Sequence, residues 1–365
     1  MRLAVTGASG LVGGQVVRAA RAEGHQVVAL TRDPRSVPAG ADVRVVALDD
    51  VAVLAAAMTG ADALVHCAAV YAYGPDRAAE VQRVNRDGTR CVVEAAGRAG
   101  VPRAVVTSSS VTCGSSPTPV ARDETGRLGE EAVPAYYASK AAQEEAALSA
   151  GAEAGVDVVL ALPTVVLGGP YRRLAPSNAM VLRYLLDPTR STFPGGCNVV
   201  DARDLGEGHL LLARHGAPGE RYLLGGQDLT WRMLHTMVAE LAGLPGPFAE
   251  IGVHTAWMAA AAAEAVARLT GSTPLSTREE ASTVGRYYWY SSAKVAALGY
   301  TPRPARAAIA ASLAWLCVGD DLPRWVREGL RLLPEVRAAR DLVPRSLSPT
   351  PRPPRRPAPA RRRPR

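Results

Sequence analysis

The sequence predicts an α/β fold in which helices cover both faces of a doubly wound parallel sheet, followed by a smaller C-terminal part. Three observations predict this fold. A glycine-rich turn lies between the first two apolar runs, strand-like and helix-like segments alternate as far as residue 163, and polar side chains cluster where the strand-like runs end. Strands that alternate with helices favour right-handed crossovers and therefore a parallel sheet.

The first segment reads as strand, glycine turn, helix and strand. Leu3–Thr6 is a short apolar run, Gly7, Gly10 and Gly13 follow at three-residue spacing, and Val27–Leu30 is the second run. In a dinucleotide site one glycine allows the sharp turn, one lets the backbone approach the pyrophosphate, and one lets the helix pack closely. The helix N-terminus then offers N–H groups to the phosphates. This segment therefore predicts a dinucleotide cofactor.

The alternation continues through the N-terminal half. Strand-like runs at 43–48, 63–69, 103–110 and 156–163 alternate with helical patterns, of which those at 76–100 and 135–154 are the longest. In open sheets of this kind the ligand binds outside the carboxyl ends of the strands. The residues expected at those ends are Gly7, Arg32, Asp49, Ala68, Ser108–Ser110 and Pro163.

The residue after the second strand indicates which form of the cofactor binds. An acidic residue there holds the ribose 2′-hydroxyl of NAD, whereas an arginine accommodates the 2′-phosphate of NADP. Thr31 and Arg32 follow the strand, and Asp33 comes two residues later than the usual acid position. We therefore expect NADP, with Arg32 at its phosphate, and NAD as the alternative.

Lys140 is informative because the chain holds only two lysines among its 42 Lys and Arg residues. Tyr136 and Tyr137 precede it by four and three residues, so on a helix either tyrosine can share its face. A phenol has a pKa near 10, which a nearby ammonium lowers. The compact ammonium can also hold ribose hydroxyls, and arginine does not replace it there. Helical spacing alone leaves both tyrosines open.

These motifs resemble those of the extended short-chain dehydrogenases/reductases, and among them the NAD-dependent epimerase/dehydratase family. TGASGLVG at 6–13 is similar to their TGxxGxxG, and YYASK contains YxxxK. The resemblance implies that Tyr136 is the general acid/base, Lys140 its electrostatic partner, and a serine after the fifth strand the ligand of the substrate carbonyl. The family spacing to Gly114 selects Ser109 for that role, with Ser110 as the runner-up.

The resemblance extends over most of the chain, to about residue 316. It implies further cofactor contacts in the glycine turn, in VNRDGT at 84–89 and in LPTVVLGGP at 162–170, namely Ser9, Leu11, Val12, Asn85, Pro163 and Val166, beside Tyr136 and Lys140. Blocks at 198–213, 219–234 and 289–309 are similar to those of hopanoid-associated epimerase-like and dihydroflavonol 4-reductase-like proteins.

The Tyr–Lys motif serves several chemistries, so other positions must select among them. Val165 and Cys197 stand where nucleotide-sugar enzymes carry an asparagine and an arginine for the diphosphate. Because a diphosphate needs donors or cations, we expect an NAD(P)-dependent oxidoreductase that acts on a ketone or secondary alcohol of a small, relatively apolar metabolite. Tyr71 and Tyr73 are expected near its pocket.

Two alternatives remain open. A nucleotide-sugar epimerase/dehydratase could use Arg172, Arg173 or Arg183 for the diphosphate. A non-catalytic NAD(P)-binding sensor is the second, although such relatives typically lose the Tyr/Lys pair that is present here.

The chain divides into a cofactor-binding core at 1–167, a mainly substrate-binding region at 168–333, from which 198–225 returns to the core, and a tail at 334–365. Residues 345–365 hold eight arginines and no acidic residue, which accounts for the net charge of +8. A segment so rich in Pro and Arg cannot bury enough apolar surface to fold, so we expect a disordered tail. The more specific hypothesis for its role is electrostatic contact with an acidic partner.

Other partners are mostly excluded. Five cysteines without a CxxC pair predict neither a disulfide framework nor a metal site, and they fit a reducing cytoplasm. The distribution of charge predicts no specific nucleic acid, and no apolar run is long enough to predict a transmembrane segment. A small-molecule substrate is the expected partner; a homodimer is common in the family that the sequence resembles.

Overall fold

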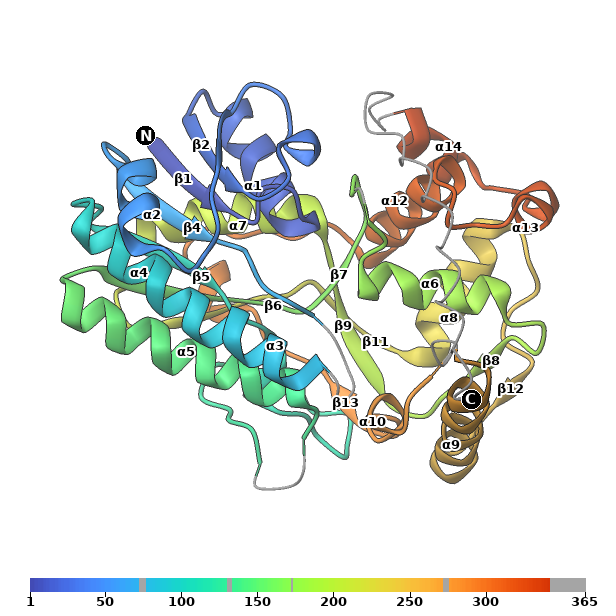
Figure 1. Ribbon diagram of the computed structural model, residues 1–365. Helices are drawn as coiled ribbons and strands as arrows, with labels where there is room; N and C mark the ends of the chain where they lie inside the picture. The colour runs from blue at the N-terminus through green and yellow to red at the C-terminus, as the bar shows by residue number, and fades with distance from the viewer. Residues whose placement is uncertain (72–76, 130–132, 172, 272–275, 342–365) are drawn as a thin grey trace, which may run out of the picture.

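The computed structural model describes residues 1–71, 77–129, 133–171, 173–271 and 276–341 (Figure 1). Its larger part is a seven-stranded parallel sheet in the order β10-β6-β5-β4-β1-β2-β3. These strands are β1 (Arg2–Thr6), β2 (Gln26–Thr31), β3 (Asp42–Val45), β4 (Ala63–His66), β5 (Arg103–Thr107), β6 (Asp157–Pro163) and β10 (Arg221–Leu224). The predicted doubly wound α/β fold is confirmed.

The chain starts in the middle of this sheet. Val5 of β1 is in register with Ala29 of β2 on one side and with Val65 of β4 on the other. The strand order therefore reverses between β1 and β4. In open α/β sheets this reversal opens a crevice at the carboxyl ends of the strands, which is where ligands bind.

Helices cover both faces of the sheet because alternate strand residues point to opposite sides. Leu3 and Val5 pack with Val16 and Val17, whereas Ala4 packs with the cluster on the other face. One face carries α1 (Leu11–Ala22) and α7 (Ala202–His215), which contact each other. The other face carries α2 (Val51–Met58), α3 (Ala78–Gln82), α4 (Gly88–Arg98) and α5 (Ala135–Ala154), with α4 and α5 side by side in Figure 1.

A second, smaller core lies to the right in Figure 1. It is built on a sheet of β7 (Val165–Leu167), β9 (Gly196–Asp201), β11 (Gln227–Thr230) and β13 (Tyr287–Tyr288). Apolar side chains of α6 (Pro176–Leu186), α8 (Trp231–Ala242) and α12 (Ala305–Val318) pack against this sheet. The remaining elements are β8 (Ser191–Thr192), β12 (Ala249–Glu250), α9 (Val253–Thr270), α10 (Arg278–Ala281), α11 (Ala293–Ala296), α13 (Arg324–Gly329) and α14 (Pro334–Asp341).

The chain passes from the large sheet to the smaller one between β6 and β7. β7 already belongs to the smaller sheet, although it precedes residue 168. β9 belongs to the smaller sheet as well. The chain therefore returns to the large sheet only after residue 201, through α7 and β10. The helix expected at 76–100 is interrupted by a π-helical turn at Arg83–Asp87, a distortion often found at functional sites.

The tail was expected to begin at residue 334, but the chain is still helical there. Residues Pro334–Asp341 form α14, and Val336 is fully buried in the smaller core, where α14 packs on α12. Ala339 packs against the same core, and Glu335 pairs with Arg306 of α12 at 3.0 Å. Residues 342–365 lie outside the described residues, so their disorder stays a prediction. Within the described part of the chain, no helix has the length and apolar character needed to cross a membrane.

Candidate active site

The glycine turn between β1 and α1 has the shape of a phosphate cradle. Gly7 has a positive φ of 66°, and a Cβ there would lie 2.7 Å from the backbone of Ala68. A Cβ on Gly13 would lie 2.3 Å from the carbonyl oxygen of Gly7. α1 begins at Leu11 behind Gly10, with no side chain capping its first N–H groups. The turn therefore requires glycine and presents backbone donors that suit a pyrophosphate.

The other predicted cofactor residues lie along the same edge of the sheet. Ala68 follows β4 and donates its N–H to Thr6 Oγ1 at 3.3 Å, and Thr31 Oγ1 donates to Ser9 Oγ at 3.4 Å. Arg32 and Asp49 follow β2 and β3 and are exposed. Half-buried Val12 is on α1, Pro163 ends β6, and half-buried Val166 lies in β7.

Tyr136 and Ser109 meet through a hydrogen bond between their side chains. Ser109 directly precedes the 3-10 turn η4 (Ser110–Cys113) after β5 and is half-buried. The neighbouring serines have other partners: Ser108 donates to Glu144 at 2.5 Å, and Ser110 forms a hydrogen bond with Tyr290. The three serines that the sequence could not separate easily thus have three different environments.

Tyr136 is buried, with 6% of its surface exposed. The ring of Tyr71 packs against it with centroids 4.2 Å apart. Burial raises the Tyr136 pKa above its usual value, the Tyr71 hydroxyl raises it further, and the hydrogen bond to Ser109 opposes this. The net shift is therefore upward, opposite to the lowered pKa expected from the sequence, because removing a phenolate from water dominates in this structure. Tyr73, also expected near the pocket, lies outside the described residues.

Lys140 lies below the Tyr136 ring, with Nζ 5.9 Å from the ring centroid. Only 2% of the lysine is exposed. Its ammonium donates to the carbonyl oxygen of Thr107 at 3.1 Å and to Gln143 Oε1 at 2.8 Å. Burial lowers the Lys140 pKa to about 8, and the charge of Glu144 partly opposes the shift. The lysine is therefore held in place by neutral acceptors and titrates close to physiological pH.

A buried network continues from Gln143 toward the first strands. Gln143 Nε2 donates to Thr89 Oγ1 at 2.9 Å, and Thr89 donates to the carbonyl oxygen of Asn85 at 2.6 Å. Because the Thr89 proton is used there, His66 Nε2, at 2.9 Å, donates to Thr89. Burial and then the Lys140 charge lower the His66 pKa to about 3, so this ring is neutral.

Asn85 fastens the π-helical turn to the chain after β4. Its Oδ1 accepts from the N–H of Val70 at 2.7 Å, and its Nδ2 donates to the Val70 carbonyl oxygen at 3.0 Å. Nδ2 also donates to Ser139 Oγ at 3.1 Å, and Ser139 donates to the carbonyl oxygen of Tyr136. The asparagine therefore positions the backbone that carries Tyr136.

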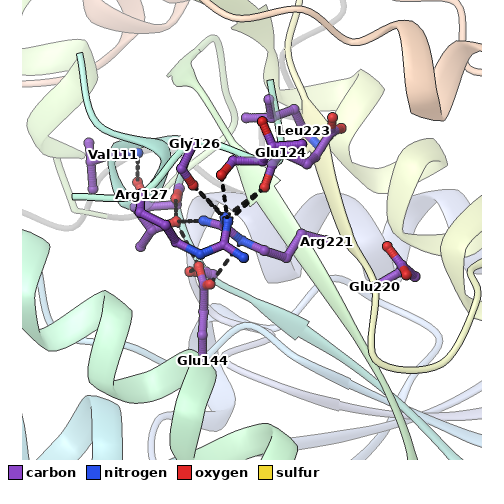
Figure 2. A network of polar contacts seen from close by, with 12 residues as sticks. Val111, Glu124, Gly126, Arg127, Glu144, Glu220, Arg221 and Leu223 are labelled. Atoms are coloured by element: carbon purple, nitrogen blue, oxygen red, sulfur yellow. Dashed lines mark hydrogen bonds and ion pairs between the residues drawn. The ribbon is translucent and has the colours of Figure 1, made fainter. Parts of the chain in front are cut away.

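Sequence reasoning missed a buried ion pair that supports the serine segment (Figure 2). Glu144 Oε2 lies 3.0 Å from Arg221 Nε, and their side chains are 11% and 9% exposed. Glu144 Oε1 accepts from Ser108 and from Thr112 Oγ1 at 2.7 Å, and Arg221 Nη1 donates to the carbonyl oxygens of Glu124 and Gly126, each at 2.8 Å. This pair joins β10, α5 and the segment that carries the catalytic serine candidate.

One signal for the missed residues was present in the sequence. Ser139, Lys140, Gln143 and Glu144 recur at helical spacing on α5, and all four are buried. A stripe of polar residues on the buried face of a helix requires partners. The partners themselves, such as Arg221, come from distant parts of the chain and have no local signal.

The sheet, the glycine cradle and the Tyr–Lys cluster are those of a nicotinamide-binding Rossmann enzyme. Residues 3–225 match the family described as the NAD dependent epimerase/dehydratase family. The chain belongs to this family, as the resemblance in its motifs predicted.

Two curated relatives illustrate the range of names in the family. The chain is 32% identical to the "Putative dihydroflavonol 4-reductase" of Synechocystis over 67% of this chain and 73% of that protein. It is 30% identical to the "4-hydroxy-2-methyl-3-oxo-4-farnesyl-3,4-dihydroquinoline-1-oxide ketoreductase" of Stigmatella aurantiaca over 73% and 81%. Among solved structures, that of gox2253 is similar with a TM-score of 0.75 and 31% identity, over 86% of this chain and 97% of that one.

Proposed function

We propose that the protein is an NADP(H)-dependent oxidoreductase that interconverts a ketone and a secondary alcohol on a small, relatively apolar metabolite. The observation that supports this most is that half-buried Ser109 lies beside the buried side chains of Tyr136 and Lys140 at the carboxyl ends of the strands. Ser109 Oγ accepts from the N–H of Val111 and bonds to Tyr136, and Lys140 is held by Thr107 and Gln143. A pre-organised proton donor and a fixed cation are what a carbonyl reduction requires of the protein.

Each residue has a distinct role in this proposal. Bound cofactor supplies the hydride to the carbonyl carbon. Ser109 Oγ donates a hydrogen bond to the carbonyl oxygen, and Tyr136 Oη donates the proton that this oxygen takes up. Because burial raises the Tyr136 pKa, the phenol is protonated at neutral pH, which suits the reduction direction. The reverse reaction returns the proton to the phenolate, whose charge the Lys140 ammonium stabilises.

Two features support an apolar substrate rather than a nucleotide diphosphate. Cys197 is 1% exposed inside the smaller core, and Val165 packs against the same cluster, so neither position offers a donor. Arg183 is engaged with Glu280 at 3.4 Å, and Arg173 is exposed. Arg172, the third arginine of the alternative, lies outside the described residues.

Aromatic rings next to the catalytic tyrosine support the same substrate class. Tyr71, Tyr136, Tyr137 and Tyr288 form a row in which successive ring centroids are 4.2, 6.3 and 6.2 Å apart. Tyr71 remains 43% exposed. Exposed aromatic surface beside the proton donor suits the body of an apolar or aromatic ketone. The relatives named as reductases are consistent with this proposal.

A cofactor-oxidation screen tests the proposal. We expect NADPH absorbance at 340 nm to fall with at least one ketone from a panel of aliphatic, alicyclic and aromatic ketones, and the corresponding alcohol to reduce NADP. UDP-glucose and dTDP-glucose serve as the comparison substrates. Epimerised or dehydrated sugar nucleotide, without net oxidation of NADPH by any ketone, would contradict the proposal and favour the nucleotide-sugar alternative.

The proposed preference for NADP depends on Arg32. It is exposed directly after β2, where a 2′-phosphate can reach it. Arg32→Asp should raise the Michaelis constant for NADPH by about 10-fold or more, since a charge-assisted contact is replaced by repulsion, and should change that for NADH much less. Equal effects on both cofactors would contradict this role.

A further inference from the structure

Arg18 on α1 is a half-buried cation without a counter-charge among the described residues. Its Nη1 is inaccessible to solvent, and no acceptor within the described part of the chain bonds to it. Burial lowers the Arg18 pKa to about 10, and no carboxylate contributes to that shift. Burying an unpaired charge is costly, and proteins compensate such charges with a partner or a ligand. Arg18 Nη1 is therefore a desolvated donor with no acceptor among the described residues.

A second unsatisfied donor lines the same small cavity. Tyr171 is 6% exposed, its hydroxyl has no hydrogen-bond partner among the described residues, and it lines a cavity with Arg18, Ser9, Gly10 and Ser36. Burial, together with the charge of Asp321, raises the Tyr171 pKa, so the hydroxyl keeps its proton. Two buried donor atoms, one of them on a charged group, thus belong to residues that line one cavity, and no carboxylate lines it.

The cavity lies on the adenosine side of the glycine turn. Ser9 and Gly10 belong to the turn itself, and Ser36 ends the short 3-10 turn η1 (Pro34–Ser36) that follows β2. The guanidinium lies over Gly14, since a Cβ there would be 3.2 Å from Arg18 Nη1 and 4.0 Å from Pro38 Cγ. In a dinucleotide site the segment after β2 receives the adenosine ribose, whereas the pyrophosphate meets the start of α1.

Tyr171 is brought to this place by the smaller core. Gln15 of α1 donates to the carbonyl oxygen of Gly169 at 2.6 Å, which fixes the segment after β7 on the glycine turn. The Tyr171 ring packs edge-on against Trp315 of α12 with centroids 5.3 Å apart. The hydroxyl is therefore held by rigid elements from both cores.

We propose that Arg18 and Tyr171 form the inner half of a subsite for the 2′-phosphate of NADP(H), with exposed Arg32 as its outer half. The inference rests on the NADP preference proposed above and adds two residues to it. A phosphate monoester dianion accepts charge-assisted hydrogen bonds from a guanidinium and a further bond from a phenol. The ligand supplies the missing negative charge, and NADH, with a free 2′-hydroxyl, does not.

Binding titrations of purified full-length variants test this subsite. NADPH, NADH, 2′,5′-ADP and 5′-AMP are titrated into wild type, Arg18→Gln, Tyr171→Phe and the control Arg21→Gln. Arg21 lies on the same helix, is exposed and donates to the His25 carbonyl oxygen. We expect Arg18→Gln to weaken NADPH and 2′,5′-ADP about 10- to 100-fold and Tyr171→Phe to weaken them about 2- to 10-fold, with NADH within twofold. The control should match wild type.

Thermal unfolding provides an independent readout. Arg18→Gln removes a half-buried unpaired charge, so its melting temperature without ligand should equal or exceed that of wild type, while the increase caused by NADPH should shrink. If Arg18→Gln does not fold, the same titrations are performed on Tyr171→Phe and Arg18→Lys.

Three results would overturn the subsite. Equal weakening of NADPH and NADH by Arg18→Gln would place the cation at the shared pyrophosphate. If wild type prefers NADPH and Arg18→Gln binds NADPH as tightly as wild type does, Arg18 is not part of the site. The preference for NADP would then depend on Arg32 alone. A wild type that binds NADPH no more tightly than NADH would overturn the NADP preference and this subsite together. Since binding needs no turnover, none of these results bears on the Tyr136 chemistry.

Discussion

The two ends of the expected cofactor site differ in how their cations are satisfied. At the catalytic end, Lys140 donates to the Thr107 carbonyl oxygen and to Gln143, and a continuous network of buried hydrogen bonds stands behind it. At the adenosine end, Arg18 Nη1 and the Tyr171 hydroxyl have no partner within the described residues. The donors of the first end are satisfied by the protein itself, whereas the second end leaves two donor atoms unsatisfied, which is where we propose that a phosphate binds.

The difference separates two tasks. Groups that act on charge as it develops are most effective when the protein fixes them beforehand, so that little reorganisation accompanies the reaction. Groups that select a ligand are most effective when only that ligand forms hydrogen bonds with them and so offsets the free-energy cost of their desolvation. An analogue without the matching group leaves them unpaired. The catalytic end follows the first rule, and the cavity at Arg18 follows the second.

The largest expected effect is at the catalytic lysine. Lys140→Met should lower kcat/KM for the best ketone of the panel by about 10²- to 10⁴-fold, the range that a positioned acid–base partner contributes. Lys294, the second lysine of the chain, is the matched control because it pairs at the surface with Glu220. Lys294→Met should stay within twofold. Similar losses in both variants would mean that the effect at 140 is not specific to the site.

Breaking the buried pair behind the serine segment should have the next largest effect. Arg221→Met leaves Glu144 buried without its cation, so the free energy of unfolding should fall by about 3–5 kcal/mol in urea titrations. Arg103→Met, which removes a looser pair with exposed Asp157 at 3.8 Å, should cost less than about 1 kcal/mol. Equal losses would indicate that the Glu144–Arg221 pair contributes no more than a surface contact.

The smallest of these effects is a shift in pH dependence. The Lys140 pKa is about 8, and the reaction needs the ammonium, so activity should fall as pH rises through that value. Gln143→Glu places a carboxylate beside Nζ and should move this limb upward by about one pH unit, and Gln143→Leu should move it downward. Coincident pH profiles of kcat in the two variants and wild type would exclude Lys140 as the titrating group.

The same shifted lysine affects stability. The folded protein holds Lys140 with a pKa of about 8 against an unfolded value near 10.5, so between these values the unfolded chain binds more protons. The free energy of unfolding contributed by this group therefore rises with pH across that window and is unfavourable below it. Differential calorimetry of wild type and Lys140→Met at pH 7 and pH 10 measures this contribution, which should vanish in the variant.

The fold and the proposed catalytic residues could be predicted because their signals are local. The glycine turn at Gly7–Gly13 needs only a short window, and the α5 range expected from the sequence, 135–154, is the range observed. The doubly wound parallel sheet could be predicted from the alternation of strands and helices alone. The start of the tail could not be predicted, because burial of Val336 depends on a groove formed by distant helices.

The parts of the site that the sequence did not reveal are those that depend on long-range contacts. Arg221 reaches Glu144 across 77 positions in sequence, and nothing in the local sequence indicates that Arg18 lines a cavity with Tyr171. Because the chain contains many arginines, a single arginine with a special role does not stand out in the sequence. The pKa of Tyr136 was misjudged for a related reason, since burial, which the sequence does not report, dominates it.

Proton donation by Tyr136 is the central claim, and a single-turnover measurement on Tyr136→Phe tests it most directly. NADPH bound to the variant is mixed with the best ketone of the panel, and absorbance at 340 nm is followed. We predict NADPH affinity within about threefold of wild type and a hydride-transfer rate lower by about 10²-fold or more. Tyr137→Phe, at the adjacent buried tyrosine, should transfer hydride at close to the wild-type rate. A near-normal rate in Tyr136→Phe would contradict the account.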